Sequence, residues 1–211
     1  MRFCAMSDLH GQLPIHLPEC DVVLLAGDIC DHGKAEFQLA WMDRKLRKWL
    51  EKINKPVFAC SGNHDWPMWS KLKEVRNLKL PWTYLQDEAT VFNGWKIYGT
   101  PWQKKFFNWA FNLDESQLMG KWNLIPDDTD VLICHGPPKY YGDRNPRGEL
   151  CGSESLTWRI GQLENLRLVC YGHIHAGYGV YSSKNTILAN VSLLDERYKL
   201  VNKPFIVELE K

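Results

Sequence analysis

Three features that would point directly to a function class are absent from this chain of 211 residues. It has no Cys-x-x-Cys pair, no apolar run of about 18 residues and no excess of either charge, since 26 basic residues stand against 25 acidic ones. Seven cysteines without that spacing predict reduced, structural thiols in a cytoplasmic protein. The missing apolar run argues against a membrane-spanning helix, and the net charge of +1 gives no global argument for nucleic acid.

The chain also lacks internal repeats, low-complexity tracts and linker-like stretches. It opens directly on the strand-like MRFCAMSD, so no targeting segment is expected. Its content of 45% hydrophobic and 24% charged residues is typical of globular proteins. Since a chain of this length can bury a substantial core, we predict a single domain over residues 1–211.

Short apolar runs bordered by Gly, Pro or Asp predict the strands of this domain. They lie at residues 3–6, 22–26, 57–60, 95–99, 131–134, 168–172, 186–191 and 205–209, with a further strand near 178–181. Apolar residues at three- and four-residue steps predict a helix over 35–53, and weaker patterns favour helices over 114–124 and 153–165. This alternation indicates an α/β layered fold, and the helix-poor tail favours antiparallel pairing there.

Five of the predicted strands end in polar residues of the same few kinds. These endings are Ser7-Asp8-Leu9-His10, Gly27-Asp28, Gly62-Asn63-His64-Asp65, His135-Gly136 and His173-Ile174-His175. Each ending alone is ordinary turn or capping material. Together they hold five of the seven histidines, and open α/β sheets bind ligands at the carboxyl ends of their strands. We therefore expect these side chains to meet in one crevice.

The expected crevice gathers two carboxylates, one carboxamide and four imidazoles, which is costly without a cation. The set consists of Asp8, His10, Asp28, Asn63, His135, His173 and His175. Such oxygen and nitrogen ligands suit Mn, Fe, Zn and similar ions, and they are too many for one tetrahedral zinc. They are enough for two ions that share a carboxylate, an arrangement that supports in-line attack at phosphorus.

The blocks SDLH, GDIC, SGNHD, CHGPP and GHIH, in this order over residues 7–175, resemble the calcineurin-like metallophosphoesterase superfamily. The stretches YLQD, IYGTPWQ, KWNLIP and GHIHAGYG are similar to its metallophosphoesterase-domain-containing, or brain-239-like, subgroup. The resemblance implies a four-layer α/β/β/α sandwich of two mixed sheets with two metal ions at the sheet edge. A divalent or mixed-valence pair is implied, with Mn expected and Fe, Zn, Ni or Co also compatible.

The resemblance also implies a role for each matching residue. It gives Asp8, His10 and His175 to the first ion, Asn63, His135 and His173 to the second, and the bridging position to Asp28. His64 is expected to contact phosphate and to protonate the leaving oxygen, and Asp65 to orient the ring of His64. An imidazolium beside a phosphate supplies both charge and a proton, which gives this division a physical basis.

The substrate-binding residues are expected in the aromatic segment 100–112, TPWQKKFFNWAFN. It is either a hydrophobic plug under a loop or an aromatic wall over a ligand, and as a wall Trp102 and Trp109 would stack on a nucleotide base. His32 stands where protein Ser/Thr phosphatases carry a phosphate-gripping arginine, so it is a further candidate for substrate contact. Because imidazole lacks the bidentate fork of guanidinium, that analogy with phosphoprotein phosphatases is weakened.

These residues predict a dinuclear metal-dependent phosphodiesterase that acts on small, including cyclic, nucleotides through a metal-bound hydroxide attacking phosphorus in line. Two other functions stay open from the sequence. One is a nuclease or end-processing phosphatase on DNA or RNA, which the balanced charge does not favour. The other is a non-catalytic nucleotide-binding scaffold, against which the complete ligand set counts. A membrane partner is not expected.

Overall fold

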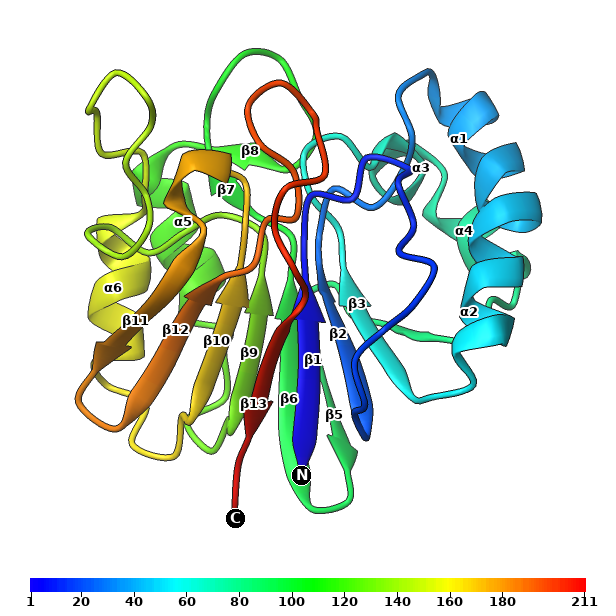
Figure 1. Cartoon of the computed structure of the whole chain (residues 1–211). Coiled ribbons are helices and arrows are strands. Elements are labelled where there is room, and N and C mark those ends of the chain that lie inside the picture. Colours follow the sequence, from blue (N-terminus) through cyan, green and yellow to red (C-terminus); the bar gives the residue numbers. More distant parts are fainter.

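The computed structural model describes all 211 residues as two β-sheets packed face to face, with helices on the outer side of each sheet (Figure 1). Helices α1, α2 and α4 cover one sheet, and α5 and α6 cover the other. The four layers are those of an α/β/β/α sandwich, so the predicted fold class is confirmed.

The first sheet has the strand order β13-β1-β2-β3-β4. Its strands are β1 (Arg2–Met6), β2 (Val22–Ala26), β3 (Val57–Cys60), β4 (Thr83–Tyr84) and β13 (Phe205–Glu208). The strands β1 to β4 run parallel, while β13 pairs antiparallel with β1. The chain therefore returns from the far sheet to place its last strand on the edge of the first one.

The second sheet has the strand order β11-β12-β10-β9-β6-β5. Its strands are β5 (Glu88–Phe92), β6 (Trp95–Thr100), β9 (Val131–Cys134), β10 (Leu168–Tyr171), β11 (Gly179–Ser183) and β12 (Thr186–Asn190). The four central strands are parallel, and the edge strands β5 and β11 are antiparallel to their neighbours. Antiparallel pairing in the tail is confirmed for β11 with β12, although β12 itself runs parallel to β10.

The remaining elements are short. The predicted helix over 35–53 is confirmed as α1 (Ala35–Trp41), the π-helical turn η1 (Met42–Leu46) and α2 (Arg47–Ile53). The others are α3 (Trp66–Ser70), α4 (Leu72–Asn77), α5 (Glu115–Trp122), α6 (Glu154–Ile160), the 3-10 turn η2 (His175–Gly177) and the paired strands β7 (Gln103–Lys104) and β8 (Asn112–Leu113). None of the helices combines the length and apolar character needed to cross a bilayer.

The central strands are apolar throughout because both of their faces are buried. In β1, Phe3 and Ala5 pack into the core between the two sheets, whereas Cys4 and Met6 pack into the core beneath the helices. All seven cysteines are free thiols. These inner strands are therefore recognised in the sequence by continuous apolar runs, and not by alternation of apolar and polar residues.

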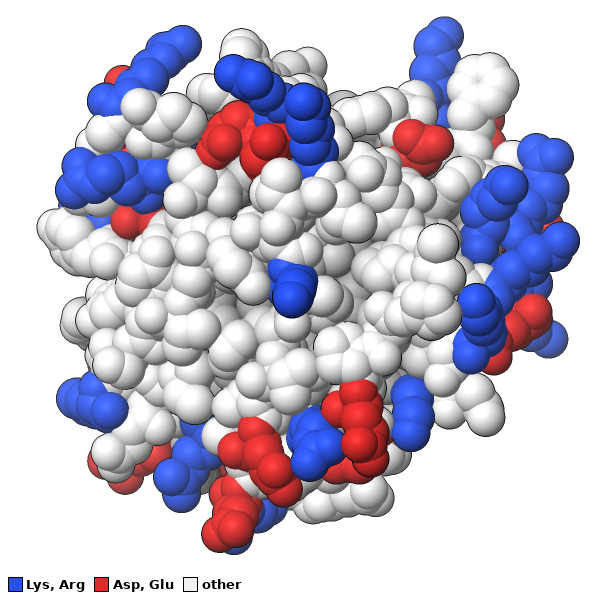
Figure 2. Space-filling view, in the orientation of Figure 1, with Lys and Arg blue, Asp and Glu red and all other residues white.

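Five parallel strands, β1, β2, β3, β9 and β10, finish at the same end of the sandwich, the upper end in Figure 1. Charged side chains of both signs are interspersed around the molecule in Figure 2, at its upper rim, its lower edge and the flank of α1 and α2. No continuous basic stripe crosses that face, so it offers no track for the phosphates of a nucleic acid.

Shortening a side chain between the two sheets is expected to destabilise the fold strongly. Leu24 of β2 is fully buried there, so Leu24→Ala removes its contacts and leaves a cavity that costs about 2–5 kcal/mol of unfolding free energy. Urea unfolding followed by circular dichroism measures the loss. The matched control is Leu124→Ala, since Leu124 is 54% exposed. Equal losses in the two variants would contradict this description of the core.

Candidate dinuclear metal centre

The residues predicted for the first ion come together where β1 and β10 end. Asp8 Oδ1 lies 3.2 Å from His175 Nε2, and the ligand atoms of Asp8, His10 and His175 lie within 4.8 Å of one another. Asp8 and His10 are buried, and His175 is partly exposed. This spacing allows one cation to be held by all three side chains.

The residues predicted for the second ion lie where β3, β9 and β10 end, and the predicted bridge Asp28 follows β2. His135 Nε2 is 2.9 Å from Asn63 Oδ1 and 3.5 Å from Asp28 Oδ2. The same Asp28 oxygen is 3.6 Å from Nε2 of His10, a ligand predicted for the first ion. Asp28 therefore stands between the two groups, where a bridging carboxylate belongs. The His173 ring lies 5.2 Å from the His135 ring, between centroids, and lines the same cavity.

Two of the imidazoles are oriented by backbone carbonyl groups. His135 Nδ1 lies 2.9 Å from the carbonyl oxygen of Ala26, and His175 Nδ1 lies 2.9 Å from that of Asp195. When Nδ1 donates to a carbonyl, Nε2 is left to bind a metal, which is how ligating histidines are commonly held. Neither ring nitrogen of the buried His10 has a hydrogen-bond partner. A cation would satisfy this otherwise orphaned imidazole.

The carboxylates and imidazoles of the site shift one another's pKa values. Burial acts to raise the pKa of Asp8, but the neighbouring His175 and His135 hold it well below its usual range. Burial acts to lower the pKa of His135, but Asp28 and Asp8 raise it to about 9. For His173, burial and then the adjacent His135 lower the pKa to about 3. The pKa of Asp28 is also held well below its usual range, against the effect of burial, by His135 and His10. Asp8 and Asp28 thus favour their ionised forms beside imidazoles whose protons a cation would replace.

Four of the predicted ligands sit in a backbone conformation that side-chain-bearing residues rarely adopt. The φ angles are 54° for Asp8, 41° for His10, 51° for Asp28 and 68° for His173, all in the left-handed region. Such strain persists only where surrounding structure enforces it, and it clusters at functional sites. These strand ends are therefore bent to aim their side chains into the crevice.

Glycines beside the ligands make room for them. A Cβ atom on Gly172 would lie 2.0 Å from Asp8 Oδ2, and one on Gly62 would lie 2.3 Å from Asp28 Oδ1. Gly27 is also in the left-handed region, at φ +91°, and its Cβ would lie 2.5 Å from His135 Nδ1. Only glycine allows the backbone to approach these groups so closely. The seven side chains and their surroundings fit a pair of cations.

His64 stands at the edge of this group. Its backbone N–H donates to Asp28 Oδ1 at 2.7 Å and its carbonyl accepts from Gln38, while its ring makes no hydrogen bond within the chain. The ring centroid lies 4.9 Å from that of His10 and 4.5 Å from that of Trp109. Burial, only partly offset by Asp28, lowers its pKa. The ring nitrogens of His64 are therefore unoccupied by the chain and available to a ligand in the cavity.

The carboxylate of Asp65 makes different contacts from those expected. Its carboxylate accepts from the backbone N–H groups of Ile29 at 3.0 Å, Cys30 at 2.8 Å and Gly62 at 2.8 Å, and it does not bond to the His64 ring. Asp65 thus joins the loop after β2 to the loop after β3. The expected ring-orienting role is corrected, because three backbone donors already occupy the carboxylate.

Several residues that support the site were not found from the sequence. Ser192 Oγ donates to Asp8 Oδ2 at 2.8 Å, and it follows the buried strand β12, so the signal of polar residues at strand ends was present there too. Gln38, buried on α1, donates to the carbonyls of Asp31 and His64, both at 2.8 Å. Tyr198 lies on an irregular loop with its ring 4.8 Å from the His10 ring, and no sequence pattern marked it.

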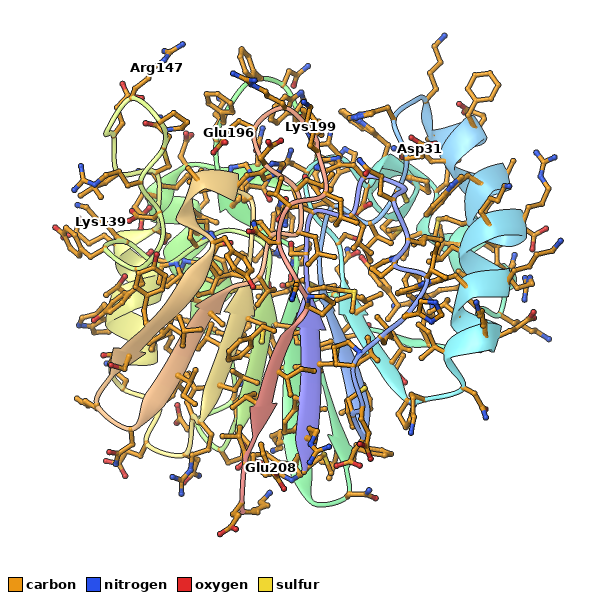
Figure 3. The ribbon with its side chains drawn as sticks, in the orientation of Figure 1. Asp31, Lys139, Arg147, Glu196, Lys199 and Glu208 are labelled. Carbon is orange, nitrogen blue, oxygen red and sulfur yellow. The ribbon has the colours of Figure 1, made fainter.

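Five of the seven candidate ligands, all except the fully buried Asp8 and His135, line a cavity of about 490 Å³. Trp109, Phe106 and Tyr198 contribute aromatic side chains to its lining, and loops on its rim carry Arg147, Glu196 and Lys199 at this end of the molecule (Figure 3). His32 is exposed beside it, with its ring centroid 5.3 Å from that of His10 and 6.0 Å from that of His64. Trp109 and His32 are thus near enough to meet a bound substrate.

Trp102 does not line the cavity, contrary to the prediction of substrate contact. Its side chain is buried, its Nε1 donates to the Asp87 carboxylate at 2.9 Å, and its ring packs edge-on against the buried Phe111. Lys121 Nζ lies 4.2 Å from the centroid of its ring. Because Asp87 offers the indole N–H a partner away from the cavity, Trp102 belongs to the core, and the plug interpretation is correct for this part of the segment.

Adding one methyl group at Gly172 is expected to remove metal from the site. The Cβ atom of Gly172→Ala would displace the Asp8 carboxylate and Ser7 Oγ, from which it would lie 2.0 and 2.2 Å. After loading with Mn²⁺ and gel filtration, elemental analysis should show that the variant has lost at least half of the metal retained by the parent chain. Gly120→Ala is the control, since nothing lies within 4 Å of that Cβ. A folded Gly172→Ala protein with full metal content would contradict the assignment of Asp8.

Known proteins resemble this chain over nearly its whole length. A model of the calcineurin-like phosphoesterase family matches residues 1–177. Human metallophosphoesterase domain-containing protein 1 is 34% identical over 99% of this chain and 71% of its own length, and the Caenorhabditis elegans UPF0046 protein T07D4.2 is 40% identical over 99% of this chain and 60% of its own.

Among solved structures, TT1561 of Thermus thermophilus superimposes with a TM-score of 0.59 over 90% of this chain and 88% of that one. Its sequence identity is 17%, so the likeness shows a shared fold. With the family match and the identities to the human and nematode proteins, the chain belongs to the calcineurin-like phosphoesterase family, in the branch of the metallophosphoesterase-domain-containing proteins.

Proposed function

We propose that this chain, as a single domain over residues 1–211, is a dinuclear metal-dependent phosphodiesterase that acts on small nucleotides, cyclic ones included. Family membership supports a phosphoester hydrolase. The observation that carries the proposal is the grouping, at five strand ends, of seven oxygen and nitrogen side chains, five of which line one cavity, with the unbonded ring of His64 beside them. A scaffold without catalysis would have no need of this strained ligand set.

In this proposal Asp8, His10 and His175 would hold one ion, Asn63, His135 and His173 would hold the other, and Asp28 would be shared by both. When bound, two such ions supply a water of lowered pKa and neutralise the charge that develops on the phosphoryl oxygens. The oxygen-rich and imidazole ligands suit Mn²⁺, and they also accept Fe, Zn, Ni or Co.

In this proposal, neighbouring residues would donate the proton to the leaving group and position the reacting side chains. His64, whose ring is free of hydrogen bonds, gives a proton to the departing alkoxide oxygen. Gln38 fixes the backbone of His64 by accepting from the Trp66 N–H and donating to the His64 carbonyl. Asp65 ties the loops after β2 and β3 together, so the Asp28 and His64 side chains keep their separation as substrate binds.

The lining of the cavity favours a nucleotide diester over a phosphoprotein. Trp109 and Phe106 offer faces for a base, and stacking on an aromatic side chain contributes about 1–3 kcal/mol. His32 cannot grip a phosphate dianion bidentately as arginine does. A distant relative from Synechococcus, 26% identical over 75% of this chain, is described as a probable cyclic nucleotide phosphodiesterase, which agrees with this choice.

Removing the imidazole of His64 is expected to slow turnover strongly and to leave the metal content unchanged. With Mn²⁺-loaded protein, bis-p-nitrophenyl phosphate should be hydrolysed faster than p-nitrophenyl phosphate, and His64→Ala should lower kcat for the diester by about 10²–10⁴-fold, the usual contribution of a positioned proton donor. His16→Ala is the control, since His16 is an exposed loop residue away from the cavity. Preference for the monoester would overturn the diesterase assignment, and full activity of His64→Ala would overturn its role as acid.

Loss of Trp109 is expected to affect nucleotides selectively. Trp109→Ala should raise KM for 2′,3′-cyclic AMP by about tenfold, the equivalent of about 1.4 kcal/mol of stacking, and should raise KM for bis-p-nitrophenyl phosphate less. Steady-state kinetics with both substrates give the ratio. Trp158→Ala serves as the matched control, because Trp158 is 58% exposed on α6 and does not line the cavity. Equal increases for both substrates would rule out base stacking on Trp109.

A further inference from the structure

Two lysines in the wall of the cavity form no ion pair within 4.0 Å, although Lys104 is near enough to Glu115 to contribute to the lowered pKa of that carboxyl. Lys104 ends β7, Lys105 follows it, and both line the cavity that holds the candidate ligands. Neither forms an ion pair, whereas Lys96, Lys121 and Lys139 each pair with a carboxylate. Lys104 is also partly buried. Because an ammonium group loses hydration when it is partly enclosed, an unpaired lysine at this position suits an anionic ligand.

The segment that carries these lysines is held firmly. The Lys105 N–H donates to the carbonyl of Leu113 at 3.0 Å, and Gln103 Nε2 donates to the carbonyl of Ala110 at 2.7 Å and to Asn112 Oδ1 at 2.8 Å. Asn112 Nδ2 in turn donates to the carbonyl of Phe106 at 2.9 Å. The loop between β7 and β8 that these hydrogen bonds hold also carries Trp109. The backbone positions of the two lysines and of Trp109 are therefore fixed relative to one another.

The acidic residues of the cavity do not neutralise this wall. Glu149 and Glu196 also line the cavity, but neither lies within ion-pair distance of Lys104 or Lys105, and Glu149 accepts instead from Asn145 Nδ2 at 2.7 Å. Glu196 lies on the loop that carries Lys199 (Figure 3). The β7–β8 side of the cavity therefore combines positive charge with aromatic faces.

We infer that Lys104 and Lys105 form a subsite for a second phosphate group of the substrate. The inference rests on the proposed function: the scissile diester lies at the metal ligands, the base lies on Trp109, and the second phosphate lies at the lysines. The substrate class becomes nucleotides that carry two phosphate groups, such as dinucleotides and phosphorylated cyclic nucleotides, in preference to simple cyclic mononucleotides. The reaction remains hydrolysis of one phosphoester bond and needs no further reactant.

Binding tests the subsite without turnover. Calorimetry on the Mn²⁺-loaded full chain compares adenosine 3′,5′-bisphosphate with adenosine 5′-monophosphate, and we expect the bisphosphate to bind at least tenfold more tightly. In the double variant Lys104→Ala/Lys105→Ala the ratio of the two dissociation constants should fall to near one. In the matched control Lys45→Ala, which removes an exposed lysine on η1 that does not line the cavity, the ratio should persist. Equal affinities in the parent chain, or an unchanged ratio in the double variant, would overturn the inference.

Turnover separates this inference from the proposed function. Thymidine 5′-(p-nitrophenyl phosphate) is compared with the same compound carrying a 3′-phosphate, so that the scissile bond is identical in the two substrates. The 3′-phosphate should raise kcat/KM about tenfold in the parent chain and by less than twofold in the double variant. Hydrolysis of both at equal rates would overturn the subsite and leave the phosphodiesterase standing. Absence of any diester hydrolysis, combined with preferential binding of the bisphosphate, would overturn the proposed function and leave the subsite standing.

Discussion

The buried charge of Asp28 is the interaction on which the site depends. The carboxylate lies between His10 and His135, two residues of opposite ligand groups, and takes the N–H of His64 on its other oxygen. A carboxylate that is buried in this way is stable in its ionised form only when it is paired with a cationic or hydrogen-bonding group. The His135 imidazole, 3.5 Å from Asp28, provides that pairing, and a cation that binds at this position would replace the imidazole proton. The requirement to compensate one buried charge therefore also prepares the site for metal.

Bringing these groups together requires unusual backbone, and the sandwich provides it at a single place. Parallel strands in both sheets end at the same rim, and the chain turns there through left-handed residues such as Asp8 and Asp28. Gly62 and Gly172 allow neighbouring strand ends to approach the carboxylates without collision. The core on both sides of each inner strand offsets the strain, because rigid strands fix where each bend begins. The packing that stabilises the fold therefore also fixes the positions of the candidate ligands.

The parts that could be predicted from the sequence are those with a strong local signal. Apolar runs located the inner strands, and the polar residues that end them located the ligand candidates, because buried parallel strands share one rim. The short strands β4, β7 and β8 carried no such run. The role of Asp65 and the burial of Trp102 depended on partners distant in sequence, the backbone of Ile29 and the carboxylate of Asp87. Partner choice of this kind follows from tertiary packing and leaves no mark in a local pattern.

Two kinds of segment line the cavity. Strand ends supply the candidate metal ligands, and they are fixed by the two cores. The β7–β8 segment and the loops around Asn145 and Tyr198 supply the rest of the lining, with aromatic and charged side chains. Exposed loop side chains tolerate substitution where inner strands do not, since they leave no cavity in the core when they change, and the buried Phe111 of the β7–β8 segment is the exception. In the proposed function, chemistry and substrate choice would therefore be physically separable: a change in the loops would alter which phosphoester fits, while the same strand ends would hold the reacting group.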